Sequence, residues 1–66
     1  MKEAVSNNVQ KFRTRAGVTQ EALAGAVGVT RQTVIAIEKG NYTPSVLLAI
    51  KIAKYFKRPV EEIFIL

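Results

Sequence analysis

Three consecutive polar side chains, Arg31, Gln32 and Thr33, follow Thr30, a residue type that often begins a helix. Arginine donates two hydrogen bonds to guanine, glutamine pairs in the same way with adenine, and methyl-bearing groups contact the methyl of thymine. Together with Ile35, these side chains form the outer face of a predicted helix, near its N-terminal half. That pattern predicts contact with base edges in the major groove of DNA, whereas an ordinary solvated helix face is the alternative.

The surrounding residues supply what is needed to position such a helix. A helix-turn-helix requires a small residue where its two helices cross, a residue that tolerates the bend, and buried apolar residues on the second helix. Ala24 is the small residue and Gly28 permits the bend. Val34 and Ile37 are the apolar residues of the second helix. The spacing therefore predicts a helix-turn-helix over about residues 19–39.

A helix over residues 5–16 is predicted to precede this motif. Its apolar residues recur at three- and four-residue steps, and Gly17 is suited to end it. Thr19 is the predicted N-cap of the next helix, which ends at Gly28. The predicted inner faces of these two helices are Val5, Val9, Phe12 and Ala16, and Ala22, Leu23, Ala26 and Val27.

Three more helices complete the prediction. The helix that follows Thr30 is expected to end at Lys39 and Gly40, and residues 40–45 have the composition of a loop. Helices over 45–56 and 59–64 come next, with Pro59 as a first helical residue. The broad apolar face expected for residues 45–56 comprises Val46, Leu48, Ala49, Ile52, Ala53 and Phe56. No segment predicts a strand, so residues 1–66 are expected to form a single all-α domain of five short helices.

Charge favours a polyanionic partner. Ten Lys and Arg against five acidic residues give a formal charge of +5 and a pI near 10.0. Nucleic acid is the first candidate, anionic membrane the second, and ordinary solubility charge the alternative. The later cations Lys51, Lys54, Lys57 and Arg58 are interpreted mostly as solvated helix-face charges.

Several classes of protein are disfavoured by what the sequence lacks. It has no Cys and no His, so no disulfide and no zinc site of those residues is expected. With so few candidate acid–base groups, the chain is predicted not to be an enzyme and to hold no cofactor. No apolar run is long enough to span a bilayer, and the first eight residues lack the apolar segment of a signal peptide, which favours a cytoplasmic protein.

The ordered set of motifs resembles the phage-repressor or Cro-type helix-turn-helix family, also called the xenobiotic-response-element family. The resemblance covers nearly the whole chain and is closest to the subgroup of very short, free-standing transcription regulators. It implies a five-helix, lambda-repressor-like fold that binds double-stranded DNA. Besides the helix-turn-helix, it rests on Val9-x-x-Phe12-Arg13-x-x-x-Gly17, Tyr42-x-Pro44-Ser45, Ala49-x-Lys51-Ile52-Ala53 and Val60-Glu61-Glu62-Ile63-Phe64.

The resemblance also implies roles for single residues. Arg31, Gln32 and Ile35 would face bases, with Ala36 at their edge. Arg13 and Glu38 would form a partly buried structural ion pair. Contacts to the DNA backbone would come from Thr19, Gln20, Thr30, Lys39, Asn41 and Tyr42, and Gln20 would also brace the base-contacting helix. The chain departs from the family where Ala22 replaces a frequent Glu that closes a capping box with residue 19.

The apolar end of the sequence predicts a homodimer. Ile63 and Phe64 are expected to cover the domain's own core, but Ile65 and Leu66 are expected in a two-fold interface, with Leu47 or Tyr55 nearby. Two base-contacting helices about 34 Å apart would bind a palindrome and allow repression. No pocket for a small-molecule effector is evident. An antitoxin or a protein-interaction module on the same scaffold is the alternative.

Overall fold

Hydroxyl side chains begin three of the helices in the computed structural model, which describes residues 5–66. Thr19 and Thr30 accept hydrogen bonds from the amides of Ala22 and Thr33, at 3.0 and 3.2 Å, which confirms both as N-caps. Ser45 accepts a bond of 3.2 Å from the amide of Leu48 in the same way. Each bond satisfies a backbone donor that lacks a partner within its helix. The helices so begun are α2 (Gln20–Val27), α3 (Arg31–Glu38) and α4 (Val46–Phe56).

The turn between α2 and α3 depends on Gly28. Its φ of 77° lies in the left-handed region, where a side chain is disfavoured, and its amide donates to the carbonyl of Ala24. The amide of Val29 also donates to that carbonyl, at 2.9 Å. Ala24 itself is 2% exposed, so it can lie between closely approaching helices. The predicted bend and the predicted small crossing residue are both confirmed.

The first helix begins later than predicted, because the two asparagines before it use other partners. Helix α1 spans Val9–Arg15, whereas residues 5–8 are not helical. The side-chain oxygen of Asn7 accepts from the amide of Val9 at 3.1 Å, and the amide of Asn8 donates to the carbonyl of Ile63 at 2.8 Å. Asparagine side chains compete in this way with helical backbone bonds.

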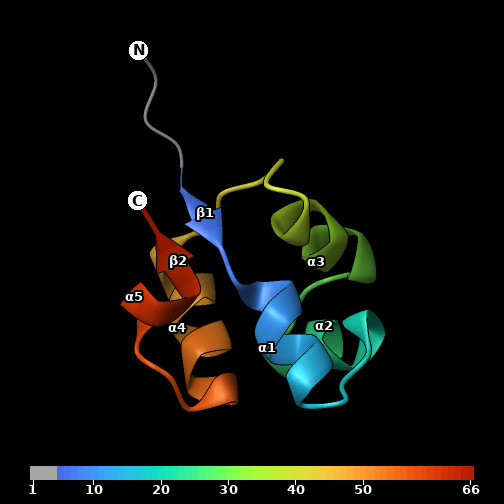
Figure 1. The fold of residues 1–66 in the computed structure, drawn as a ribbon. Helices are drawn as coiled ribbons and strands as arrows, with labels where there is room; N and C mark the ends of the chain where they lie inside the picture. Colours follow the sequence, from blue (N-terminus) through green and yellow to red (C-terminus); the bar gives the residue numbers. More distant parts are fainter. Residues whose placement is uncertain (1–4) are drawn as a thin grey trace.

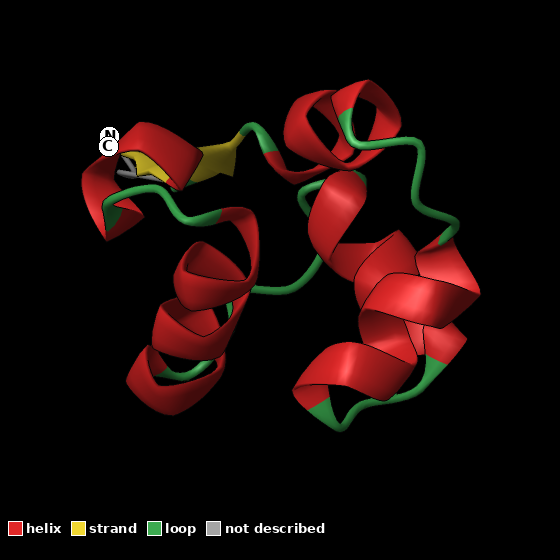
Figure 2. Ribbon diagram, turned by 90° about the horizontal axis from the view of Figure 1, so that it is seen from below, coloured by secondary structure: helices red, strands yellow, loops and turns green. Residues whose placement is uncertain are grey.

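A two-stranded antiparallel sheet joins the two ends of the described chain. Strand β1 (Ser6–Asn7) pairs with β2 (Phe64–Ile65), with Ser6 opposite Ile65 and Asn7 opposite Phe64. Figure 1 shows the two strands side by side, and Figure 2 shows them at the edge of the helical body. The expectation of no strand was therefore wrong. The predicted helix over 59–64 is shortened to α5 (Val60–Ile63), since Phe64 is extended and Pro59 is the N-cap.

Every helix contributes to one core. Leu23 and Ile37 are fully buried, and α2 and α3 make the most extensive contact between two elements. The predicted inner faces were wrong at five positions that are exposed, namely Val5, Ala16, Ala22, Ala26 and Val46. The buried apolar residues are Val9, Leu23, Ala24, Val27, Val34, Ile37, Leu48, Ile52, Ala53 and Ile63.

Within residues 5–66 the structure is predominantly helical, as predicted, with five helices and the small sheet. The longest helix, α4, has 11 residues. No helix in this part of the chain has the length and apolar character needed to cross a bilayer.

Candidate nucleic-acid interface

The two sides of α3 differ in polarity and burial. Val34 and Ile37 are 1% and 0% exposed and hold the helix against the core. Arg31 and Gln32 are exposed in its first turn. The other three predicted base-contacting residues, Thr33, Ile35 and Ala36, are half-buried. The N-terminal half of α3 therefore presents a cation and an amide to the surroundings from a rigidly packed helix.

The start of α3 is fixed by two threonines. Besides capping the helix, the hydroxyl of Thr30 lies 3.1 Å from that of Thr33. This bond orients both hydroxyls at the first turn, beside Arg31. Thr30 and Thr33 can still accept or donate one further hydrogen bond, because a hydroxyl has both functions.

A partly buried ion pair fixes the other end of α3. The Nε of Arg13 in α1 lies 2.6 Å from Oε2 of Glu38, and the two side chains are only 12% and 5% exposed. Arg13 Nη1 also donates to the carbonyl of Val18, at 2.9 Å. These bonds satisfy both charged groups away from water, as a buried pair requires. The Glu38 carboxylate therefore faces inward, where it does not oppose a polyanion.

Gln20 links α2 to the same carboxylate. Its Nε2 donates to Oε1 of Glu38 at 3.0 Å, so the first residue of α2 contacts the last residue of α3. This bond is a bracing interaction between the two helices. The amide oxygen of Gln20 takes no part in this bond, so an acceptor remains at the N-terminal end of α2.

Asn7 is a positioning residue that the sequence interpretation missed. Its Nδ2 donates to the carbonyl of Ile37 at 2.8 Å, near the end of α3, while its oxygen accepts from Val9. Its position before a helix could have been predicted from the sequence, since adjacent asparagines ahead of an apolar run are typical of a helix start. Its hydrogen bond to Ile37 could not have been predicted from local pattern, because residues 7 and 37 are 30 positions apart.

The predicted backbone-contacting residues flank α3. Lys39 is the C-cap of α3, and Asn41 and Tyr42 are exposed in the loop that follows. The amide of Asn41 donates to the carbonyl of Ala36 at 2.9 Å, which holds the start of this loop against the helix. Thr19 and Thr30 are exposed at the N-terminal ends of α2 and α3.

The four predicted dimer residues are not all brought together. Leu47 and Leu66 are 65% and 83% exposed, and Ile65 is 43% exposed in β2. Tyr55 lies near the end of α4, which Figure 1 places at the bottom of the molecule, far from the C-terminus at the upper left. Val46, which was predicted to face the core, is 77% exposed beside Leu47.

Two short helices joined by a glycine turn, with the second helix apolar inside and polar outside, define a helix-turn-helix protein. The chain belongs to the Cro/C1-type helix-turn-helix family, whose model matches residues 9–63. It is a DNA-binding transcription regulator and not an enzyme.

Known proteins agree with this membership. The chain is 55% identical over 60 residues to the HTH-type transcriptional regulator YgzD of Bacillus subtilis, and the match covers 91% of each protein. Its fold is similar to the crystal structure of the restriction-modification controller protein C.AhdI from Aeromonas hydrophila, with a TM-score of 0.77, 29% identity and 83% coverage of both chains.

A more distant relative is a repressor. The cryptic phage CTXphi transcriptional repressor RstR of Vibrio cholerae is 31% identical over 58 residues. The match covers 88% of this chain but 52% of RstR, so the likeness concerns about half of that protein.

Proposed function

We propose that the protein binds a palindromic operator in double-stranded DNA as a homodimer and represses transcription. The observation that carries the proposal is the difference between the two sides of α3. Val34 and Ile37 are buried in the core on one side, and Arg31 and Gln32 are exposed in the first turn on the other. A helix with this arrangement places its N-terminal side chains at base edges when it enters the major groove. Arg31 supplies paired donors for guanine and Gln32 an amide for adenine.

Contacts to the DNA backbone would set the register of α3. The N-terminal end of α2 offers Thr19 and the free amide oxygen and second N–H of Gln20, while Lys39, Asn41 and Tyr42 follow the other end of α3. Such contacts fix a protein on the duplex without discriminating bases. The inward-facing Glu38 supports this assignment, because its charge is paired with Arg13 instead of opposing phosphates.

Dimerisation is supported by the exposed apolar residues Leu47, Ile65 and Leu66. One α3 contacts too few bases to select a single site, whereas two related by a two-fold axis select a palindrome. The repressor role is supported by the likeness to RstR, and a cytoplasmic location follows from action on DNA.

Selection of bound duplexes from a random DNA pool at about 0.15 M salt, near physiological ionic strength, tests the proposal. Sequencing is expected to recover a palindrome whose half-sites lie about one helical turn apart. Sedimentation of the protein with that duplex is expected to give two chains per site. If no sequence is enriched and all binding disappears as salt rises, the protein is a non-specific cation and the proposal fails.

A further inference from the structure

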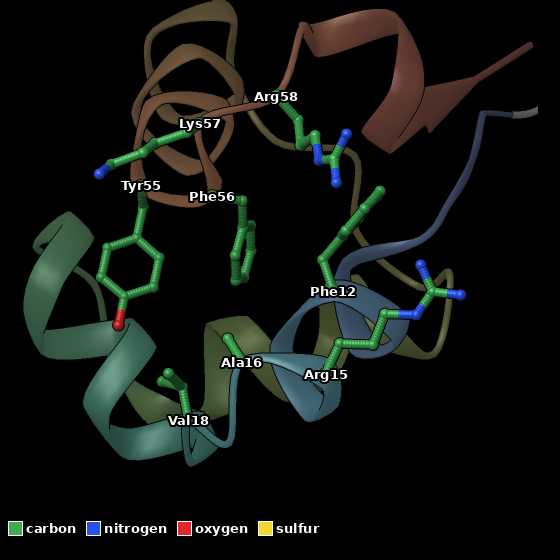
Figure 3. Close-up of a pocket in the computed structure, with 8 residues that line it drawn as sticks. All are labelled: Phe12, Arg15, Ala16, Val18, Tyr55, Phe56, Lys57 and Arg58. Carbon is green, nitrogen blue, oxygen red and sulfur yellow. The ribbon is translucent and has the colours of Figure 1, made fainter.

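A hollow lies between the ends of α1 and α4, away from α3. Its volume is about 370 Å³, and Figure 3 shows side chains of both helices around it. The floor is apolar and mostly aromatic, formed by Phe12, Val18, Tyr55 and Phe56. Figure 1 places these helix ends at the bottom of the molecule and α3 at the upper right. The hollow is thus on a different surface from the predicted base contacts.

The aromatic floor is ordered by ring contacts. The centroids of Phe12 and Phe56 are 6.1 Å apart, and Tyr55 meets Phe56 edge to face at 5.1 Å. Tyr55 remains 38% exposed, so part of this apolar surface is in contact with water. Rigid aromatic groups of this kind contribute large contact areas to protein interfaces at low entropic cost.

The rim of the hollow is cationic. Arg15, Lys57 and Arg58 line it, and none of its lining residues is acidic. Arg58 stacks over the ring of Phe12 at 5.6 Å, and its Nη1 lies 3.7 Å from Oε1 of Glu62, with both side chains half-exposed. Such an exposed pair is weak, so it leaves the positive potential of the rim largely uncompensated.

One of these cations occupies an unfavourable backbone conformation. Lys57 ends α4 with a φ of 56°, and it is the one non-glycine residue with positive φ within residues 5–66. Glycine is the usual residue at this position after a helix, because a Cβ is strained there. The chain therefore has a charged side chain at the rim where glycine would suit the backbone better.

A second hollow extends the same surface. Its volume is about 540 Å³, and it shares Tyr55 with the first. Lys51 and Lys54 add two cations, and small residues of α2, among them Gly25 and Ala26, form its floor. Again no acidic side chain lines it. Tyr55 thus lines both hollows, and five lysines and arginines line one or the other.

We propose that this surface, defined by Tyr55, Phe56 and the cations of both hollows, docks an acidic segment of a partner protein that carries an aromatic or aliphatic anchor. Carboxylates would meet the cationic rim while the anchor covers the aromatic floor. DNA phosphates would match the charge but would gain nothing from the apolar floor. A small molecule is disfavoured because the hollows are open, and ligand sites normally enclose most of their ligand. Arg31 and Gln32 stay free for DNA while the segment is bound.

Selection from a phage-displayed library of random peptides, with the whole protein immobilised, tests the proposal. We expect enriched peptides that combine several carboxylates with an aromatic or aliphatic residue. One enriched peptide is then made with a fluorescent label, and its Kd is measured by anisotropy. Arg15→Glu, on the rim, is expected to weaken binding about tenfold or more, because it places a carboxylate opposite carboxylates. Lys11→Glu, an exposed cation of α1 outside both hollows, changes net charge equally and is expected to change Kd less than about twofold.

Three outcomes would overturn the proposal. The library could enrich no acidic peptide with an apolar residue, or Arg15→Glu and Lys11→Glu could weaken the peptide equally, which would reveal only a net-charge effect. In the third outcome, a random-sequence DNA duplex displaces the peptide, and Arg15→Glu weakens binding of this duplex as much as it weakens binding of the peptide. That result would mean that the surface binds phosphates. Circular dichroism of both variants is expected to match the parent, since both side chains are exposed. The test does not depend on operator binding, so it stands if the proposed function fails.

Discussion

Helices α3 and α4 differ in what they present outward. Both bury apolar residues inside, with Ile37 and Ile52 at 0% and 1% exposure. Outward, α3 presents Arg31 and Gln32 in its first turn, whereas the N-terminal half of α4 presents Leu47 and Ile50, which are 65% and 41% exposed, ahead of its exposed lysines. An outer face of charged and amide groups suits a polar ligand such as DNA, and an apolar outer face suits another protein surface. Two helices that follow one another in the chain, each with a buried inner face, can therefore serve different partners.

Within α3, different residues contribute to folding and to binding. Its inner face and its last residue contact the core and the ion pair, while its first two residues contact solvent. Substitutions at the end of the helix should act on stability, and those at its start on affinity.

Glu38→Ala is expected to lower the free energy of unfolding by about 3–5 kcal/mol, because it leaves the guanidinium of Arg13 buried without its partner. Urea unfolding followed by circular dichroism measures this loss. Glu38→Gln is the control, since it retains a carbonyl acceptor, and its loss is expected to be smaller. A loss below about 1 kcal/mol for Glu38→Ala, the range of surface pairs, would mean that the pair does not fix the end of α3.

Arg31→Ala is expected to lower affinity for the selected operator by about 1–3 kcal/mol without changing stability, because the side chain is exposed. It should also relax base preference at one position. Anisotropy titrations on operator and on random duplex measure both effects. Equal losses on the two duplexes would assign Arg31 to phosphate contact, and Lys11→Ala controls for the loss of one charge.

Leu66→Asp is expected to weaken the dimer about tenfold, or ~1.4 kcal/mol, because it places a charge in an apolar interface. Stability of the monomer should not change, since Leu66 is 83% exposed. Analytical ultracentrifugation measures the dimer dissociation constant, with Gln10→Asp as a control that adds the same charge to an exposed position of α1. An unchanged sedimentation profile would exclude Leu66 from the interface.

Ala22→Glu is expected to stabilise the fold by about 0.3–1 kcal/mol. The amide of Ala22 already donates to Thr19, so a glutamate there can return a bond to the amide of Thr19 and complete a capping box near the positive end of α2. Thermal unfolding measures the gain. Ala22→Gln keeps the reciprocal bond without the charge and separates the two contributions.

The central part of the fold was predictable because its signals are local. Thr19 and Thr30 cap the helices that follow them, and Gly28 takes the positive φ that a turn demands, all within a few residues of sequence. The ion pair of Arg13 and Glu38 was available only through the family resemblance, because the two residues are 25 positions apart.

The ends of the chain and the outer face of α4 were not predictable in the same way. A strand of two residues such as Ser6–Asn7 has no alternation to detect, and its partner lies 59 residues away for Ser6. Val46 was assigned to the core because residues 46–50, at the start of α4, are all apolar, so the pattern alone does not show which of them face inward.

The small sheet has a consequence for amide hydrogen exchange. The segment that contains Asn7 and Asn8 is bonded at once to β2, to α5 and to the carbonyl of Ile37. Opening of the chain ends would therefore also free the last turn of α3, so these segments should exchange as one cooperative unit. The amides of Asn8 and of Lys39 should then share one opening free energy. Asn7→Ala should lower the opening free energy of both amides together, while the opening free energies of the amides inside α2 stay unchanged.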